Sequence, residues 1–230
     1  MASAHVVAGE REGDIASADR IRDAAIERFG RDGFRAGLRS IAADAGVTAG
    51  LVVHHFRSKD GLRRACDDHV LAVVREQKAK ALTDGTATML LAQLAEVERF
   101  APLVRYLLRS LQAGGDLAGA LLAQLAADAE EYLAAGEAAG VIQPSRDRAA
   151  RTRYLTYQAV GGMVLWFTTH EAVLEPGPFQ KLFRQYVEEI TLPALELFTQ
   201  GLFIDRSMLD DYLMYVPDPP PAGNAASAAA

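Results

Sequence analysis

Apolar residues recur at helical spacing along most of the chain, whereas strand-like alternation and hairpin dipeptides are scarce. Ile21, Ala25 and Phe29 repeat every fourth residue and predict a helix that ends near Arg31, with Gly33 as its stop. Two residues are expected to cap its start, Ser17 or Asp19. The fold class predicted from this pattern is all-α.

Two short helical segments follow at 38–45 and 48–56, separated by a turn at Gly46. Helices this short are unstable alone in water, so they must pack on each other and on the first helix. Ser58 is expected to cap a longer helix. The apolar stripe of that helix comprises Leu62, Ala65, Cys66, His69, Val70 and Val73.

Five more helical segments are predicted after the helix breakers Asp84 and Gly85: 87–98, 100–112, 116–139, 147–173 and 178–200. Pro102 is expected at a helix start, whereas Pro193 predicts a kink or a break. A short helix at 207–215 is expected to pack against the body. The Pro-rich residues 216–230 are expected to be disordered.

Charge is distributed unevenly along the chain, whose net charge is -6. Residues 19–64 hold ten Arg or Lys against six Asp or Glu, a net charge of +4. Residues 65–230 hold 13 against 21, a net charge of -8. A basic N-terminal segment on an acidic body is compatible with nucleic-acid binding, because phosphates attract cations that are gathered on one surface.

Several other function classes lack their characteristic residues. Cys66 is the only cysteine, so the chain has no disulfide framework and fits a reducing cytoplasm. Residues 1–14 hold no apolar signal core, and the uncharged run 154–170 is too short and polar for a membrane span, so we expect a cytoplasmic protein with a buried helix there. The histidines show no metal-ligand spacing, and no GxSxG, Walker or GxGxxG motif supports an enzyme. No metal site, cofactor or catalytic residue is predicted.

Residues 38–56 have the pattern of a helix-turn-helix, in which the second helix enters the major groove and the first braces it. Gly46 can adopt the positive φ that a tight turn needs, and Ala42 is small enough for the helices to cross closely. Ile41 and Val52 are expected to seal the apolar contact between them. This segment therefore predicts DNA binding.

Short motifs in this region resemble the tetracycline-repressor (TetR) family of transcriptional regulators: Gly33-Phe34, Leu38–Ala42, Ala45–Thr48, His54–Phe56 and Ser58–Leu62. The similarity covers Asp19 to Ala65, and beyond it only the length and the helical pattern agree with the family. The resemblance implies four parts: a flexible arm over 1–18, a DNA-binding domain over 19–64, an effector-binding and dimerisation domain over 65–215, and a disordered tail over 216–230.

The resemblance also implies which positions contact DNA. In this chain they are Arg39, Ser40, Thr48, Ala49, Gly50, Leu51, Val53, His54, His55 and Lys59. Arg39 would hold guanine O6 and N7, while His55 and Lys59 would contact phosphates. Arg39 could instead be a solvated surface charge, and His54 could pack beside Phe56.

The chain departs from the family pattern at residues that matter for DNA readout. Gly37 stands where Ser or Thr usually caps the first helix of the motif, and the link before it is one residue short. Leu51 replaces a common Thr, and Val53 and His55 replace common tyrosines. Because Ala49, Leu51 and Val53 are apolar, contact with thymine methyl groups and readout of DNA shape are favoured over hydrogen bonding.

In the family, the last two long helices pair with those of a second copy, and they correspond here to 147–173 and 178–200. Gly161 and Gly162 would allow close helix approach. The apolar face is expected to comprise Leu182, Phe183, Tyr186, Ile190, Leu195 and Phe198. A homodimer is predicted, because reading two half-sites one helical turn apart requires two heads.

The resemblance further implies a small-molecule pocket in the body. The candidate lining residues are Phe100, Leu103, Tyr106, Leu107, Leu125, Tyr132, Tyr154, Tyr157, Met163, Trp166, Phe167 and His170. Tyr106, Tyr157, Trp166 and His170 are favoured because each combines a polar tip with an apolar surround, although such residues are as often ordinary core. Asp128, Glu130 and Glu131 are interpreted as a solvated face, and one that pointed inward would favour a cationic lipophilic ligand.

The sequence therefore predicts a DNA-binding transcriptional regulator, and the main hypothesis is a repressor that a small apolar effector releases from a palindromic operator by a population shift. Activation of transcription is equally compatible with the sequence. One alternative is a regulator whose body binds a protein partner and no small effector. The other is a helical-bundle enzyme or lipid carrier, which would not show steeply salt-dependent DNA binding.

Overall fold

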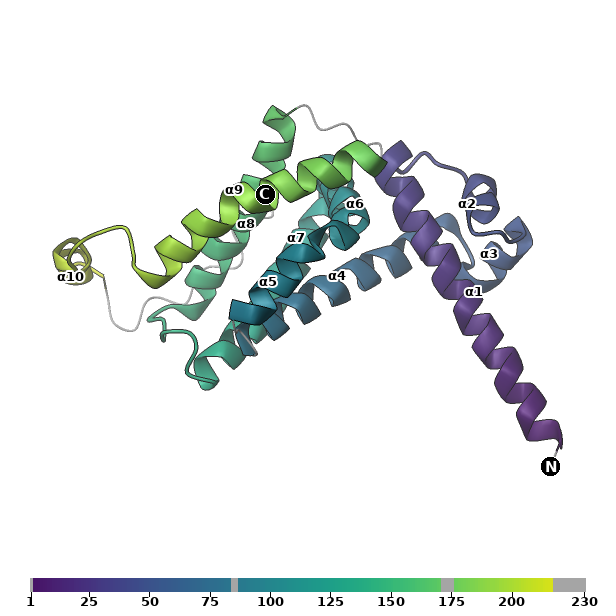
Figure 1. Cartoon of the computed structure of the whole chain (residues 1–230), viewed down its shortest axis with the longest axis horizontal. Helices are drawn as coiled ribbons and strands as arrows, with labels where there is room; N and C mark the ends of the chain where they lie inside the picture. The colour runs from purple at the N-terminus through teal and green to yellow at the C-terminus, as the bar shows by residue number, and fades with distance from the viewer. Residues whose placement is uncertain (1, 84–86, 171–175, 217–230) are drawn as a thin grey trace.

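The computed structural model describes residues 2–83, 87–170 and 176–216, and within these ranges every regular element is a helix. The all-α prediction is therefore confirmed. The helices are α1 (Ala2–Asp32), α2 (Leu38–Asp44), α3 (Ala49–Phe56), α4 (Lys59–Thr83), α5 (Ala87–Ala95), η1 (Val97–Phe100), α6 (Ala101–Gln112), α7 (Gly115–Ala138), α8 (Arg148–Thr169), α9 (Pro176–Thr199) and α10 (Ser207–Leu213). Figure 1 shows α2 and α3 beside α1 at one end of an elongated molecule, whose other helices form the body.

The head is held by one apolar core that α1, α2, α3 and the first turns of α4 enclose. Ile21 and Phe29 of α1, Ile41 of α2, Val52 of α3 and Leu62 of α4 are each 0 % exposed. One face of each helix is thus buried, as amphipathic spacing requires. Because α2 and α3 are too short to persist alone, this shared core is what fixes their positions.

The body is built around α4, which runs continuously from the head and packs against α7, while α8 packs on the other side of α7. The predicted domain boundary at 64/65 falls inside α4, so the two parts share this helix. A second connection is α6, which packs against α1, α7 and α9. Leu108, Phe167 and Phe179 are each 1 % exposed and form part of the body's core.

Several predicted boundaries are confirmed within a few residues, including those of the segments at 38–45, 48–56, 100–112 and 116–139. Ser58 caps α4, because its Oγ accepts a hydrogen bond from Gly61 N at 3.0 Å. Pro102 lies in the first turn of α6, as predicted. The segment predicted at 87–98 is divided into α5 and η1. The breaker at 84–85 and the residues 171–173 and 217–230 lie outside the described residues.

Helix α1 begins far earlier than the sequence pattern predicts, since it starts at Ala2 and includes most of the segment expected to be a separate flexible arm. The prediction that Ser17 or Asp19 caps its start is wrong, because both lie inside the helix. The Ser17 hydroxyl instead donates a hydrogen bond to Gly13 O, one turn earlier, at 2.5 Å. This pattern lets a serine sit in a helix interior.

Three expectations for the C-terminal helices are also corrected. Of the kink or break predicted at Pro193, the break is wrong, because α9 continues through this residue to Thr199. Helix α8 is buried on one face only, so the expected buried helix is amphipathic. The prediction that the last helix packs against the body is wrong, since none of residues 207–213 is buried. No helix among the described residues is long and apolar enough to cross a bilayer.

Candidate functional site

The turn between α2 and α3 has the geometry that the sequence predicts. Gly46 adopts a φ of +66°, which residues with a Cβ rarely accept. Val47 N donates to Ala42 O at 2.9 Å, which closes the turn on the preceding helix. Ile41, Ala42 and Val52 are at most 2 % exposed, so the contact between the helices is sealed. The prediction of a helix-turn-helix is confirmed.

Both helices of the motif begin in a defined way. The Thr48 hydroxyl caps α3 by accepting a hydrogen bond from Leu51 N at 3.2 Å. Gly37 occupies the cap of α2, as the sequence comparison suggests, and has no side chain with which to cap. The Ser40 hydroxyl donates to Gly37 O at 2.7 Å. Ser40 thus braces the start of α2 from within the helix.

The outer face of α3 presents a mostly apolar surface to solvent. Gly50, Val53 and His54 are exposed, and Val53 is 45 % exposed. Ala49 and Leu51 are half-buried and pack on the head's core. The five candidate groove positions from Ala49 to His54 therefore form two sets, one that faces outward and one that is partly used in packing. His54 belongs to the outward set.

His55, an expected phosphate contact, turns its imidazole back toward α1 in this structure. Its Nε2 lies 3.4 Å from Asp14 Oδ1, and only 9 % of the side chain is exposed. The contact exists because α1 extends beyond the predicted start of the helix and reaches α3. The sequence could not place Asp14 beside His55, since the residues of the early α1 turns show no apolar periodicity.

Three cations lie at helix ends of the motif and at the start of α4. Arg39 is exposed in the first turn of α2, and Lys59 begins α4, where the helix dipole favours anions. Arg57 is exposed between α3 and α4 with a φ of +66°. Gly61 permits this tight junction, because a Cβ there would lie 2.1 Å from Phe56 O. Arg57 is not among the predicted DNA contacts. Its position directly before the Ser58–Leu62 motif is the sequence feature that could have indicated it.

The candidate effector residues do not form one group in the described structure. Leu107, Leu125 and Met163 are buried core, whereas Phe100, Leu103 and Tyr132 are half-buried. Tyr154 and Tyr157 point away from the body's core, with 64 % and 59 % of their surfaces exposed. These two tyrosines therefore do not share an enclosed space with the buried candidates in a single chain.

Four aromatic residues do come together between α8 and α9. Phe167 stacks on Phe179 with ring centroids 5.2 Å apart and lies 5.4 Å from Tyr186, and Trp166 lies 5.3 Å from Tyr186. Trp166 Nε1 donates to Glu189 Oε2 at 2.8 Å. His170 stacks on Trp166 at 3.9 Å and is exposed. Trp166 and His170 thus lie at the open edge of a mainly buried aromatic cluster.

Tyr106 belongs to the junction of head and body. It is 0 % exposed, and its ring lies 5.7 Å from Phe34 and 6.5 Å from Phe29. Its hydroxyl donates to Asp67 Oδ1 at 2.7 Å. Burial raises the pKa of Asp67 above its ordinary value, while this hydrogen bond and Arg63 oppose the rise. The polar tip that suggested a pocket residue is therefore used to join α6 to α4.

Two arginines of α6 fasten the C-terminal end of α1. The Arg105 guanidinium, 1 % exposed, pairs with Glu27. Arg109 Nε donates to Gly30 O at 3.2 Å, and its Nη2 donates to Arg31 O at 3.1 Å. Gly30 allows this approach, since a Cβ there would meet the Tyr106 backbone nitrogen at 3.3 Å. This junction leaves no local signal in the sequence, because its partners are separated by about eighty positions in the chain.

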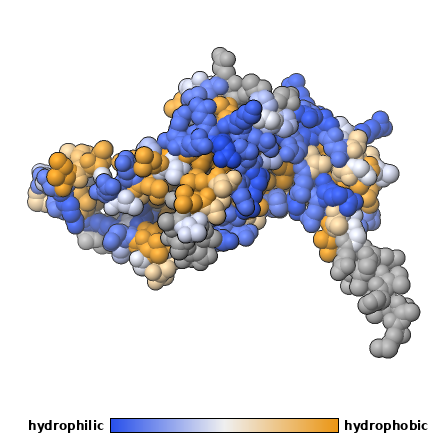
Figure 2. Space-filling view, viewed as in Figure 1, coloured by the Kyte–Doolittle hydropathy of each residue, from blue (hydrophilic) through white to orange (hydrophobic). Residues whose placement is uncertain are grey.

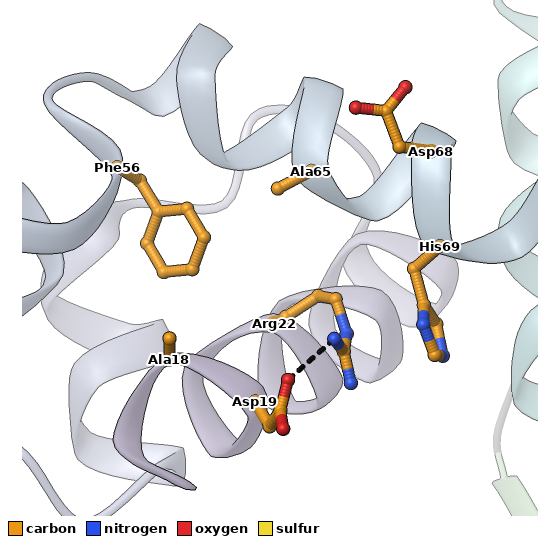
Figure 3. Close-up of a pocket in the computed structure, with 7 residues that line it drawn as sticks. All are labelled: Ala18, Asp19, Arg22, Phe56, Ala65, Asp68 and His69. Atoms are coloured by element: carbon orange, nitrogen blue, oxygen red, sulfur yellow. Dashed lines mark hydrogen bonds and ion pairs between the residues drawn. The ribbon is translucent and has the colours of Figure 1, made fainter. Parts of the chain in front are cut away.

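A surface cavity of about 380 Å³ lies in the head between α1 and α4 (Figure 3). Its lining comprises Ala18, Asp19, Arg22, Phe56, Ala65, Asp68 and His69. Arg22 Nη1 pairs with Asp19 Oδ1 at 2.7 Å inside it. Burial lowers the pKa of His69, which favours the neutral imidazole. None of the predicted effector residues lines this cavity.

Comparison with known proteins decides the family. The profile described as bacterial regulatory proteins, tetR family, matches residues 21–66, and that of the tetracyclin repressor-like C-terminal domain matches residues 98–204. The HTH-type transcriptional regulatory protein RaaS of Mycobacterium tuberculosis is 48 % identical over 203 residues, which are 88 % of this chain and 94 % of RaaS. The chain belongs to the TetR family of transcriptional regulators.

A solved structure of another protein shares the fold of this chain. It is described as a candidate fatty acid metabolism regulator of Clostridium perfringens, and it aligns with a TM-score of 0.52 over 81 % of this chain and 100 % of that chain. The two sequences are 15 % identical, so the likeness concerns the fold alone. The chain is thus a DNA-binding transcriptional regulator with a TetR-type head and body.

Proposed function

We propose that this TetR-family regulator is a homodimeric cytoplasmic repressor that binds a palindromic operator and leaves it when a small apolar effector fills the body. The observation that carries the proposal is the helix-turn-helix, with Arg39 in the first turn of α2, Arg57 directly after α3 and Lys59 at the start of α4. An acidic body with a net charge of -8 over residues 65–230 leaves DNA binding to this basic head.

The division of labour in the head follows from exposure and charge. Arg39 is the proposed base contact, because its guanidinium can bind guanine O6 and N7 together. Lys59 is the proposed phosphate contact at the start of α4, with the helix dipole adding to its charge. Gly50, Val53 and His54 would face the groove, where apolar contact with thymine methyl groups and DNA shape carry much of the specificity.

The surfaces available for a homodimer lie on α8 and α9. Gly161 and Gly162 are exposed, and a Cβ added to either would meet no described atom within 4 Å. Ile190, Leu195 and Phe198 are 39 %, 42 % and 68 % exposed, as the predicted dimer face requires. Phe183 and Tyr186 of that predicted face are buried within a single chain, so the free apolar surface belongs to the C-terminal half of α9.

The effector would act on the connection between body and head. The aromatic cluster at Trp166, Phe167 and Tyr186 is the proposed region of contact, because it combines apolar rings with an open edge. Asp128 points inward and is 5 % exposed, but it already accepts from Gln124 at 2.9 Å and faces Arg75 at 3.9 Å. A neutral apolar effector therefore fits better than a cation.

Coupling would pass through α6, which touches both parts. In one conformation the two heads have the spacing that fits the operator, and in another α6 and α1 have moved and the spacing is different. An effector that binds the second conformation more tightly increases its population and so weakens DNA binding. The shift in operator affinity cannot exceed the effector's differential affinity for the two states.

A gel-shift experiment with DNA flanking the gene tests the proposal. The expected result is a retarded complex that weakens steeply with salt and protects a palindrome from cleavage. A compound screen on this complex should then find apolar molecules that dissociate it. Absence of salt-dependent DNA binding, or a chain that stays monomeric at micromolar concentration, would refute the proposal.

A further inference from the structure

The segment 201–216, called the C-terminal arm below, exposes an unusual amount of apolar surface. It leaves α9 at Gly201, whose φ is +76°. Seven of its apolar residues are at least 65 % exposed: Leu202, Phe203, Ile204, Met208, Tyr212, Met214 and Tyr215. Figure 2 shows hydrophobic residues gathered at the end of the molecule that carries α10. Exposed apolar patches of this kind mark interaction sites.

The arm gains little from its own chain. Helix α10 has seven residues, none of them buried, and it lies apart from the body in Figure 1. Arg146 Nη2 donates to Val216 O at 3.1 Å and ties the end of the arm near the start of α8. A seven-residue helix is not stable alone in water. Another surface is therefore needed to hold it.

A matching apolar stripe runs along the outer face of α8. Tyr154, Tyr157 and Leu165 are 64 %, 59 % and 64 % exposed, on the face opposite to the buried Met163 and Phe167. Gly161 and Gly162 follow these tyrosines along α8 and belong to the proposed pairing of the helices, so the surface left for the arm is the one around Tyr154 and Tyr157. Exposed tyrosine rings can receive bulky apolar side chains such as those of the arm.

The charges of the arm and of α8 are complementary. The arm contains Asp205, Asp210 and Asp211 against Arg206, a net charge of -2. Arg153 is exposed next to Tyr154 in the first turns of α8, while its neighbours Arg148 and Arg151 pair with Glu137. An acidic arm is repelled by anionic membrane surfaces, so the apolar patch does not fit a lipid partner.

We infer that the C-terminal arm of one copy packs against Tyr154 and Tyr157 in the first half of α8 in a second copy, so that a dimer exchanges its two arms. The inference rests on the homodimer proposed above and names a contact that adds to the pairing of α8 and α9. The hydrogen bond between Arg146 and Val216 O holds the end of the arm near the start of α8. Even so, neither the arm nor the exposed tyrosines of α8 are covered within one chain. A two-fold pair would bury both surfaces twice.

Truncation measures the arm's contribution to the dimer. A chain ending at Gln200 lacks the whole arm, and a matched control ending at Val216 lacks only the residues after it. We expect the dimer dissociation constant of the first chain to rise at least about tenfold in sedimentation equilibrium, because apolar anchors dominate interface affinity. The control should match the full chain. Equal dissociation constants for the two truncated chains would overturn the inference.

Cysteine cross-linking in the full-length chain tests which copy receives the arm. Cys66 is 0 % exposed and burial raises the pKa of its thiol to about 12, so the native chain serves as an unreactive background. Copies with Ile204→Cys and one affinity tag are mixed with copies carrying Tyr157→Cys and another tag. Oxidation should join the two tags. A disulfide that forms only when both cysteines are on one chain would overturn the inference.

A charge exchange separates this contact from general apolar adhesion. Arg153→Glu should weaken the dimer, and combining it with Asp211→Arg should restore part of the lost affinity. The inferred arm contact and the proposed function can fail separately. A truncated chain that dimerises and binds DNA normally would refute the arm contact and leave the proposed function intact. A monomeric, DNA-inactive full chain would refute the proposed function instead.

Discussion

Tyr106 on α6 donates a hydrogen bond to Asp67 on α4 at 2.7 Å, between the rings of the head and the core of the body. The phenol is 0 % exposed, and the pKa values of both groups are raised, chiefly by burial. This contact places one polar pair at the point where a change in the body must pass to the DNA-binding helices.

The substitution Tyr106→Phe removes this hydrogen bond and keeps the ring. We expect the free energy of unfolding to fall by about 1–2 kcal/mol, because Asp67 loses a donor in a partly buried place. Urea denaturation measures the change. Tyr154→Phe is the control. Because Tyr154 is 64 % exposed, removal of its hydroxyl group should change the free energy of unfolding by less than about 0.5 kcal/mol. Equal losses in the two variants would contradict a special role for Tyr106.

The pH dependence of stability should reveal Asp67. Its pKa in the folded chain is raised above the ordinary 3.8, so the folded state holds this proton at pH values where the unfolded state has lost it. Its contribution to stability is therefore full below the ordinary pKa and declines as pH rises through the folded pKa. Relative to Asp67→Asn, the native chain should lose stability as the pH rises above the ordinary pKa of Asp67. The difference in free energy of unfolding between the native chain and Asp67→Asn should therefore depend on pH. A difference that stayed constant, or that moved in favour of the native chain as pH rose, would contradict a raised pKa for Asp67.

The closeness of α1 and α6 at Gly30 can be measured by adding one methyl group. Gly30→Ala would bring a Cβ to 3.3 Å from the Tyr106 backbone nitrogen and 3.1 Å from Arg105 Nε. Crowding by this backbone should cost about 1–3 kcal/mol, in spite of alanine's higher helix propensity. Gly119→Ala in α7 is the matched control, because it is exposed and meets no described atom within 4 Å. The control should gain stability, and thermal denaturation compares the two.

Arg39 and Lys59 should affect DNA binding in different ways. Arg39→Ala is expected to cost about 1–3 kcal/mol in operator binding and to relax the preference at one base pair per half-site. Lys59→Ala should weaken binding to all sequences alike and reduce the salt slope by about 1 for each head. Fluorescence anisotropy over a salt series with operator and scrambled DNA distinguishes them. If Arg39→Ala left every base preference unchanged, its proposed contact would be excluded.

The helix-turn-helix could be predicted from the sequence because its determinants are local. Ala42, Gly46 and Val52 lie within eleven residues, and a positive φ, a small side chain and an apolar contact each leave a direct trace in residue type. The same holds for Ser58, whose capping bond spans three residues. Such features follow from covalent geometry and one turn of helix.

The junction and the body could not be predicted in the same way. Tyr106 resembles a pocket residue because a polar tip on an apolar ring is the common signal of both environments, and its partner Asp67 is 39 positions away. The early turns of α1 were missed for another reason. Their residues form no apolar stripe, so the contact of Asp14 with His55 depends on the helix continuing from the head and not on local sequence.

Arg109 places its positive charge on the carbonyl oxygens of Gly30 and Arg31, at the negative end of the α1 dipole. Arg109 thus satisfies the last carbonyls of α1 and, together with Arg105, attaches α1 to α6. Fraying of the last turn of α1 would break both Arg109 hydrogen bonds, and movement of α6 would expose those carbonyls. Amide hydrogen exchange in this single turn would therefore report how firmly the reading head is seated, even in the absence of DNA.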